Sequence, residues 1–199
     1  MRMPLILSLA LVLALQAVSF AQPSPLTSTV VLGGMAVPCQ YRFRADATLD
    51  MMTVTVTLLT AAGLPVPAWP TTCTLAPNAG TLAFCSCCPN PQVGVTDGAG
   101  GIVFTWNKVG GRGTLDVFVA AAPIAFVLPI TFTSPDLTGS CEFAPASSTG
   151  ILDLALFASC LPPAPYCIGS DYNCSGTINV VDLGIWAGGL GDGCGLPCA

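Results

Sequence analysis

Residues 22–135 alternate between apolar and polar positions in short runs. The alternation is strict over residues 52–58, where threonines occupy every second position, and it predicts a half-buried β-strand. Further strands are predicted at residues 102–106, 115–119 and 125–133, because glycine-rich turns separate these runs. No helical periodicity lies between them. The pattern therefore predicts a mainly β protein, with an antiparallel β-sandwich over residues 22–135.

Residues 136–199 follow a different pattern. Two similar apolar runs begin at Asp153-Leu154 and at Asp182-Leu183, and each carries an aromatic residue three positions after its leucine, Phe157 and Trp186. These runs predict two short helices. A helix of this length is marginal alone, so we expect the apolar residues of the two helices to pack together.

The N-terminus has the organisation of a secretory signal peptide. Arg2 precedes an apolar stretch at residues 5–17, and Ser19-Phe20-Ala21 places small residues where signal peptidase reads them. We expect cleavage after Ala21, with residues 1–21 removed, no membrane span afterwards and a secreted or cell-surface location. The alternative is an uncleaved membrane anchor, for which the apolar stretch is short.

Composition removes several classes of function. The 199 residues include no histidine, which excludes His-dependent nucleophilic catalysis and His-ligated zinc. Only five residues are Lys or Arg and the net charge is −5, which argues against nucleic-acid binding. We expect no enzymatic activity. The alternative enzyme, a hydrolase using the sandwich carboxylates Asp46 and Asp50, would need them paired in a cleft.

Eleven cysteines in an exported chain indicate disulfides. Five precede residue 135 and six follow it, so pairing within each half would leave one thiol in the first half. Cys141 and Cys160 are candidates for a bridge in the second half. A thiolate zinc site formed by Cys73 with Cys85, Cys87 and Cys88 is an alternative that lacks paired Cys-x-x-Cys spacing.

The acidic residues concentrate after residue 135, where six carboxylates accompany no Lys or Arg. This segment would repel itself unless a cation bound it. Oxygen-bearing residues recur there at positions 1, 3, 5, 7, 9 and 12 of a twelve-residue loop, with glycine at position 6, which is the calcium-loop pattern. The predicted calcium ligands are Asp171, Asn173, Ser175, Thr177 (through its carbonyl), Asn179 and Asp182.

The segment 170–191 resembles a type I dockerin repeat, which has this loop, a final aspartate followed by leucine, and one helix. Dockerins carry two repeats. Residues 136–160 are similar to a degenerate first repeat, since Asp136 and Asp153 bracket 18 residues instead of 12. The resemblance implies a dockerin-like, EF-hand-like module over residues 136–199, with calcium as its cofactor.

In dockerins, loop positions 10 and 11 meet a cohesin partner. The resemblance transfers this role to the aliphatic residues Val180, Val181, Ile151 and Leu152. The basic pair often found later in the helix is Ala187-Gly188 here, and this departure leaves a second interpretation, in which the aliphatic residues dock onto the protein's own sandwich.

Residues 45–122 resemble the bacterial immunoglobulin-like domains of invasins and intimins. The resemblance rests on Val-x-Val-x-Leu, Gly-x-Pro-Val and Thr-Asp-x-x-Gly-x-x-Phe-x-Trp in succession, and the chain departs from it in a cysteine-rich insertion at residues 73–88. It implies an immunoglobulin-like, adhesion-supporting sandwich. We therefore expect a non-catalytic interaction or adhesion protein, or alternatively an accessory subunit of a polysaccharide-degrading assembly tethered through cohesin.

Overall fold

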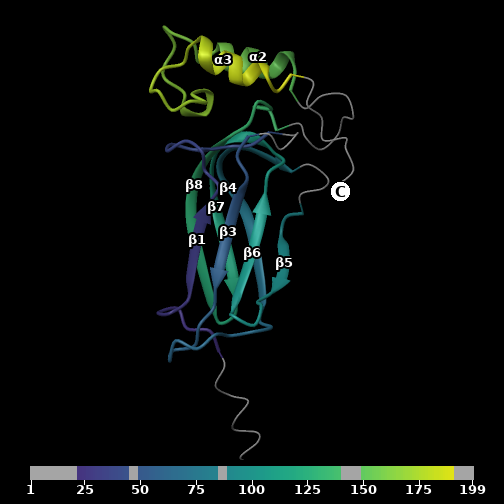
Figure 1. Ribbon diagram of the computed structural model, residues 1–199. Coiled ribbons are helices and arrows are strands. Elements are labelled where there is room, and N and C mark those ends of the chain that lie inside the picture. The colour runs from purple at the N-terminus through teal and green to yellow at the C-terminus, as the bar shows by residue number, and fades with distance from the viewer. Residues whose placement is uncertain (1–21, 45–48, 85–88, 140–148, 191–199) are drawn as a thin grey trace, which may run out of the picture.

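The protein is mainly β, with two sheets and a small helical tail. The computed structural model describes residues 22–44, 49–84, 89–139 and 149–190, and Figure 1 shows the tail at one end of the sheets. The strands are β1 (Thr29–Gly33), β2 (Tyr41–Arg42), β3 (Met52–Thr57), β4 (Pro70–Phe84), β5 (Gln92–Val95), β6 (Gly101–Trp106), β7 (Val109–Ala121) and β8 (Ile124–Thr133). The tail contains α2 (Ile151–Ala158), the 3₁₀ turn η2 (Ile168–Ser170) and α3 (Val180–Ala187).

The two sheets have the orders β1-β3-β6 and β2-β8-β7-β4-β5. Neighbouring strands are antiparallel except that the two-residue strand β2 pairs parallel to β8. The strands predicted at residues 52–58, 102–106, 115–119 and 125–133 are confirmed as β3, β6, β7 and β8. The predicted signal peptide, residues 1–21, lies outside the described residues.

Both sheets contribute to one apolar core. Val54 of β3 and Trp106 of β6 are fully buried against Leu75 of β4 and Val117 of β7. In β3 the buried residues alternate with threonines, as the sequence pattern predicts. Burial of this alternating face joins the two sheets into one unit.

The cysteine-rich segment of residues 73–88 belongs to a strand as far as residue 84. Residues 70–84 form β4, which lies between β7 and β5 in the second sheet. The pairing with β7 shifts register between Pro77 and Ala79. Pro77 and Gly80 look like turn residues in the sequence, but here they belong to a long strand with an irregularity that absorbs them.

Cys73 of β4 is a free thiol in the core. Burial raises the pKa of this thiol to about 12, so it stays protonated at neutral pH. We expect the Cys73 peptide to remain unlabelled by iodoacetamide at pH 8 in the native protein and to be labelled fully in guanidinium chloride. Mass spectrometry of the alkylated peptides measures this. Rapid native labelling would contradict the buried position.

The two predicted helices form, and their apolar residues share a second core. Phe157 of α2 packs against Trp186 of α3 and against Tyr172, with ring centroids 6.1 and 6.4 Å apart. Leu137 and Ile178 are buried in the same cluster. The helices thus stabilise each other as expected from their shortness. Among the described residues, no helix has the length and apolar content needed to cross a bilayer.

Candidate functional site

The predicted calcium loop connects η2 to α3. Asp171 follows the last residue of η2, and Asp182 lies in the first turn of α3. The chain turns sharply where Cys174 and Gly176 adopt positive φ angles of 57° and 79°. Glycine suits this conformation because it has no Cβ to clash.

The Asp171 carboxylate closes the first half of the loop. It is fully buried, and its Oδ1 accepts a hydrogen bond from the Ser175 amide at 3.0 Å. Its Oδ2 accepts from the Gly176 amide at 2.8 Å and from the Tyr166 hydroxyl at 2.7 Å. These bonds wrap the backbone around one carboxylate. Hydrogen bonds to an ionised acceptor are stronger than those between neutral groups, so they stabilise this turn.

The Asp182 carboxylate closes the second half. It is also fully buried, and it accepts from the Asn173 amide at 3.2 Å and from the Asn179 amide at 3.0 Å. Asn179 is the N-cap of α3, and its Oδ1 accepts from the Val181 amide at 2.8 Å. Asp182 therefore caps the helix while it joins positions 3, 9 and 12 of the loop.

The neutral ligand candidates lie between these carboxylates. The Ser175 hydroxyl donates to the Thr177 carbonyl at 2.9 Å, and Asn173 Oδ1 accepts from the Ser175 amide at 3.0 Å. Asn179 Nδ2 is 3.3 Å from Thr177 Oγ1. The structure thus connects all six predicted ligand residues through short contacts within one loop.

The loop chemistry fits a hard cation held mostly by neutral oxygens. Neither Asp171 nor Asp182 forms an ion pair with a Lys or Arg in the described part of the chain. Two buried carboxylates without a positive partner are costly, and a bound divalent ion would offset their charge. Among the same residues there is no cluster of three or more His, Cys, Asp or Glu side chains that could hold a metal. The predicted loop offers two carboxylates, and its remaining donors are amides, hydroxyls and a carbonyl.

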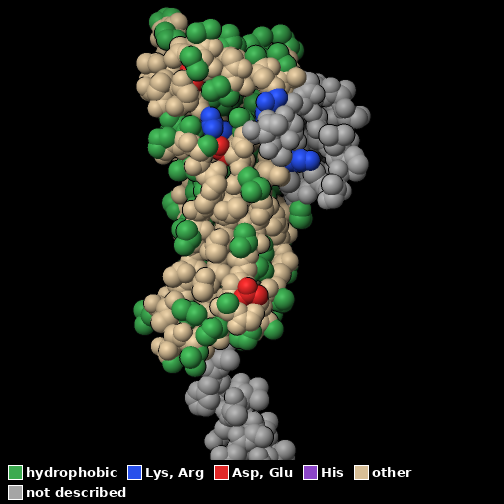
Figure 2. All heavy atoms as spheres, in the orientation of Figure 1, with side chains coloured by type: hydrophobic (Ala, Val, Ile, Leu, Met, Phe, Trp, Pro, Cys, Tyr) green, Lys and Arg blue, Asp and Glu red, His purple; other side chains and the backbone are tan. Residues whose placement is uncertain are grey.

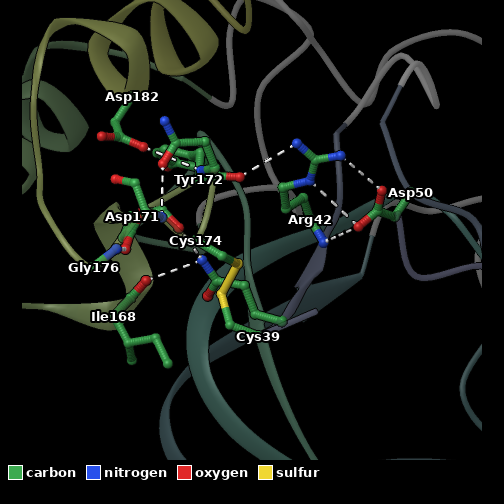
Figure 3. The surroundings of a disulfide bond; sticks show 12 residues. Cys39, Arg42, Asp50, Ile168, Asp171, Tyr172, Cys174, Gly176 and Asp182 are labelled. Atoms are coloured by element: carbon green, nitrogen blue, oxygen red, sulfur yellow. Dashed lines mark hydrogen bonds and ion pairs between the residues drawn. A yellow bond between two sulfur atoms is a disulfide. The ribbon is translucent and has the colours of Figure 1, made fainter. Parts of the chain in front are cut away.

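Three closely spaced residues of the sandwich hold the beginning of this loop (Figure 3). Cys39 forms a disulfide with Cys174 at loop position 4. The buried Gln40 amide donates to the Ile168 and Asp171 carbonyls at 3.0 and 2.8 Å. Arg42 donates to the Tyr172 carbonyl at 3.3 Å and forms an ion pair with buried Asp50 at 3.2 Å. We call residues 39–42 the clasp.

The sequence did not predict the clasp, because its contacts join positions about 130 residues apart. Pairing of cysteines within each half is wrong for Cys39, which crosses to the tail. The suggested bridge between Cys141 and Cys160 is also wrong, since Cys160 pairs with Cys167 seven residues later. Six cysteines lie outside the described residues: Cys85, Cys87, Cys88, Cys141, Cys194 and Cys198. Of the four cysteines in the alternative zinc site, the structure describes Cys73.

The carboxylates proposed for the alternative hydrolase are not described as a pair. Asp50 is buried and bound to Arg42, with the Arg42 amide donating to its Oδ2 at 2.8 Å. Asp46 lies outside the described residues. Asp50 therefore has a structural role, because it holds Arg42 of the clasp.

The first repeat retains the second half of the loop geometry. Asp153 Oδ1 accepts from the Thr138 amide at 2.8 Å and Oδ2 accepts from the Gly150 amide at 2.8 Å. These bonds match those that Asp182 receives at positions 3 and 9. Residues 140–148, which contain the six extra positions, lie outside the described ranges, and calcium at this repeat stays an open prediction.

The four predicted partner-binding residues are exposed. Ile151 and Leu152 begin α2, and Val180 and Val181 begin α3, with exposed fractions of 77, 69, 78 and 52%. They are not the residues that pack onto the sandwich. The tail meets the sandwich through other groups, for example where the Gly111 amide and the Thr133 hydroxyl donate to the Asp136 and Gly169 carbonyls at 2.6 and 2.5 Å.

Comparison with known proteins identifies no family. No protein-family profile matches the chain, and no curated protein matches it. Two solved structures share a weak likeness, a β-glucosidase from Listeria innocua in complex with gluconolactone and the same enzyme in complex with glucose. They are 14 and 12% identical, with TM-scores of 0.30 and 0.27. The likeness covers 53% of this chain and 16% of theirs, so the chain spans a small part of those enzymes.

Proposed function

We propose that this protein is a secreted or cell-surface, non-catalytic interaction protein whose calcium-stabilised, dockerin-like tail presents two aliphatic pairs to a protein partner. The observation that carries the proposal is the exposure of these pairs at the N-termini of two helices that share one core. Isolated exposed aliphatics are ordinary on protein surfaces. We therefore base the proposal on the repetition of an exposed aliphatic pair at equivalent positions of two helices.

The tail is built to present these residues from a fixed position. The clasp and the backbone contacts hold one side of the tail on the sandwich, and Figure 2 shows apolar side chains over its outer end. A rigid presentation lowers the entropy lost when a partner binds. The two described disulfides agree with an oxidising, extracellular compartment.

Calcium has a structural role in this proposal. Bound by Asp171, Asp182 and the neutral oxygens of the loop, it supplies positive charge between two buried carboxylates. The chain's own residues fix the loop backbone and place Val180 and Val181 directly after it. With two formal charges among the ligands, we expect affinity typical of extracellular calcium sites, with Kd on the order of 10⁻⁴ to 10⁻³ M.

A panel of purified cohesins tests the partner class. We expect the full chain to bind at least one cohesin in calcium, measured by biolayer interferometry, and Val180→Asp/Val181→Asp to weaken that binding at least about tenfold. Charges introduced into a desolvated contact are costly, whereas the same residues are exposed in the free protein.

Val93→Asp is the matched control, because Val93 is a valine of the sandwich with 71% exposure. It should leave binding and the melting temperature unchanged. Failure of every cohesin to bind, with the protein folded and calcium present, would remove the tethering function. Equal loss of binding in Val93→Asp would show that the contact lies elsewhere.

A further inference from the structure

A cavity of about 410 Å³ lies where the tail segment before the calcium loop crosses the second sheet. Its sandwich side includes Gly80, Arg112 and Gly113, and its tail side includes Tyr166 and Ile168. This volume falls within the range of small-molecule sites. The proposed partner-binding residues are not among its lining residues.

Among the described residues that line this cavity, Arg112 is the one with a charged side chain. It is half-buried, and the polar contact described for its side chain is a long one, 3.7 Å from Nη1 to Cys160 Sγ. No described carboxylate lies within ion-pair distance of it. Gly169 leaves room for the arginine, because a Cβ there would stand 3.1 Å from Arg112 Cδ. A guanidinium carries five donors in a fork that matches a carboxylate, and sulfur is a weak acceptor, so most of this donor capacity is unused.

Tyr166 supplies an aromatic surface and a fixed hydroxyl. Its side chain is half exposed, and the hydroxyl donates to Asp171 Oδ2 at 2.7 Å. While it donates this bond, the phenol oxygen can still accept a hydrogen bond from a ligand hydroxyl.

Two glycines leave part of the cavity wall without side chains. Gly80 and Gly113 face each other across β4 and β7 with positive φ angles of 94° and 138°. A Cβ at Gly80 would stand 2.0 Å from the Arg112 carbonyl oxygen, so a larger residue cannot replace it without a shift of the backbone. The two glycines lie beside Arg112 in the lining of the cavity.

We propose that this cavity binds an acidic sugar, a uronic-acid unit, with its carboxylate on Arg112 and one ring face on Tyr166. A hydroxyl-bearing ring matches the aromatic surface and the fixed phenol oxygen better than a bare anion does. The carboxylate matches the guanidinium fork. This inference goes beyond the proposed protein partner and does not require that a cohesin bind.

Titration with digalacturonate and trigalacturonate tests it, with the neutral galactose oligomers of equal length as ligand controls. Isothermal calorimetry and NMR shifts of the full chain, in calcium and again with chelator, measure binding. We expect the uronates to bind at least about tenfold more tightly than the neutral sugars. Arg112→Met should reduce uronate binding at least about tenfold, as loss of a charge-assisted contact predicts.

Lys108→Met makes the same change of charge outside the cavity lining and should bind like wild type. Because Arg112 packs against Gly169, the melting temperature of Arg112→Met is checked, and Tyr166→Ala gives an independent test with the same expected direction. Equal binding of neutral and acidic sugars, unchanged binding in Arg112→Met, or no binding at 10 mM ligand (roughly −2.7 kcal/mol by the affinity scale) would overturn the proposal. Preferential binding of a carboxylate-terminated peptide would overturn the sugar assignment. Loss of cohesin binding alone would leave it intact.

Discussion

Replacing both Cys39 and Cys174 with serine is expected to lower the free energy of unfolding by about 4 kcal/mol. The bridge joins residues 135 positions apart, so it removes much of the loop-closure entropy of the unfolded chain. It also holds loop position 4 beside Gln40, and its loss should reduce calcium affinity. Guanidinium titration followed by far-ultraviolet circular dichroism and tryptophan fluorescence measures the first effect, and calorimetric calcium titration measures the second.

The second described disulfide provides the matched control. Cys160 and Cys167 are separated by seven residues in the same tail, so their double serine variant should lose only about 2 kcal/mol. It should retain more of the calcium response, because this bridge does not touch the loop from Asp171 to Asp182. Equal losses in the two variants would contradict the role assigned to the clasp. An unchanged unfolding midpoint without Cys39–Cys174 would show that the tail does not depend on it.

The sequence predicted the local parts of this fold well. Alternation identified β3, because one face of that strand is buried and the other carries threonine. The Asp-Leu runs identified both helices, because each helix has in its first turn an aspartate that accepts a hydrogen bond from the N-cap amide. These features depend on residues close together in the sequence, and hydrophobic periodicity is a signal of such local structure.

The missed parts depend on distant contacts. The strand β4 contains Pro77, Asn78 and Gly80, which have turn character. Its pairing with β7 along twelve residue pairs holds this part of the chain as a strand. The Cys39–Cys174 bridge had no local signal, since disulfide connectivity follows from three-dimensional proximity. For the candidate site, spacing predicted the loop residues, and their binding of calcium stays a prediction. The sandwich residues that hold the loop were found only in the structure.

The clasp changes how the tail is understood. The sequence divides the chain into a sandwich and a tail, but Gln40 and Arg42 of the sandwich donate to the backbone of the predicted calcium loop itself. Tyr172, at loop position 2, lies in the tail core and donates its hydroxyl to the Ser134 carbonyl at the end of the sandwich. Burial raises the pKa of Tyr172, so this donor stays protonated at neutral pH. The loop therefore packs against both the tail core and the sandwich, and its stability should be linked to that of the sandwich.

Asp171→Ala is expected to abolish the calcium response and to destabilise the protein even without calcium. In calcium-free buffer the variant leaves the Ser175 and Gly176 amides and the Tyr166 hydroxyl without their acceptor, a loss on the order of 3 kcal/mol. In 10 mM calcium the wild type should gain about 1.4 to 2.7 kcal/mol for a Kd between 10⁻³ and 10⁻⁴ M. The variant should gain nothing. Thermal and denaturant unfolding with chelator and with calcium measures both effects.

Asp97→Ala separates cation binding from loss of a carboxylate in a turn. Asp97 Oδ1 accepts from the Ala99 and Gly101 amides at 2.8 Å each, as Asp171 does in its loop, but Asp97 is exposed and belongs to the sandwich. Its replacement should lower stability slightly and leave the calcium gain at the wild-type value. A calcium gain retained in Asp171→Ala would place the ion elsewhere. Wild-type protein that unfolds identically in chelator and in calcium would remove the ion from the proposal, and the two buried carboxylates would then be held by backbone amides and the Tyr166 hydroxyl alone.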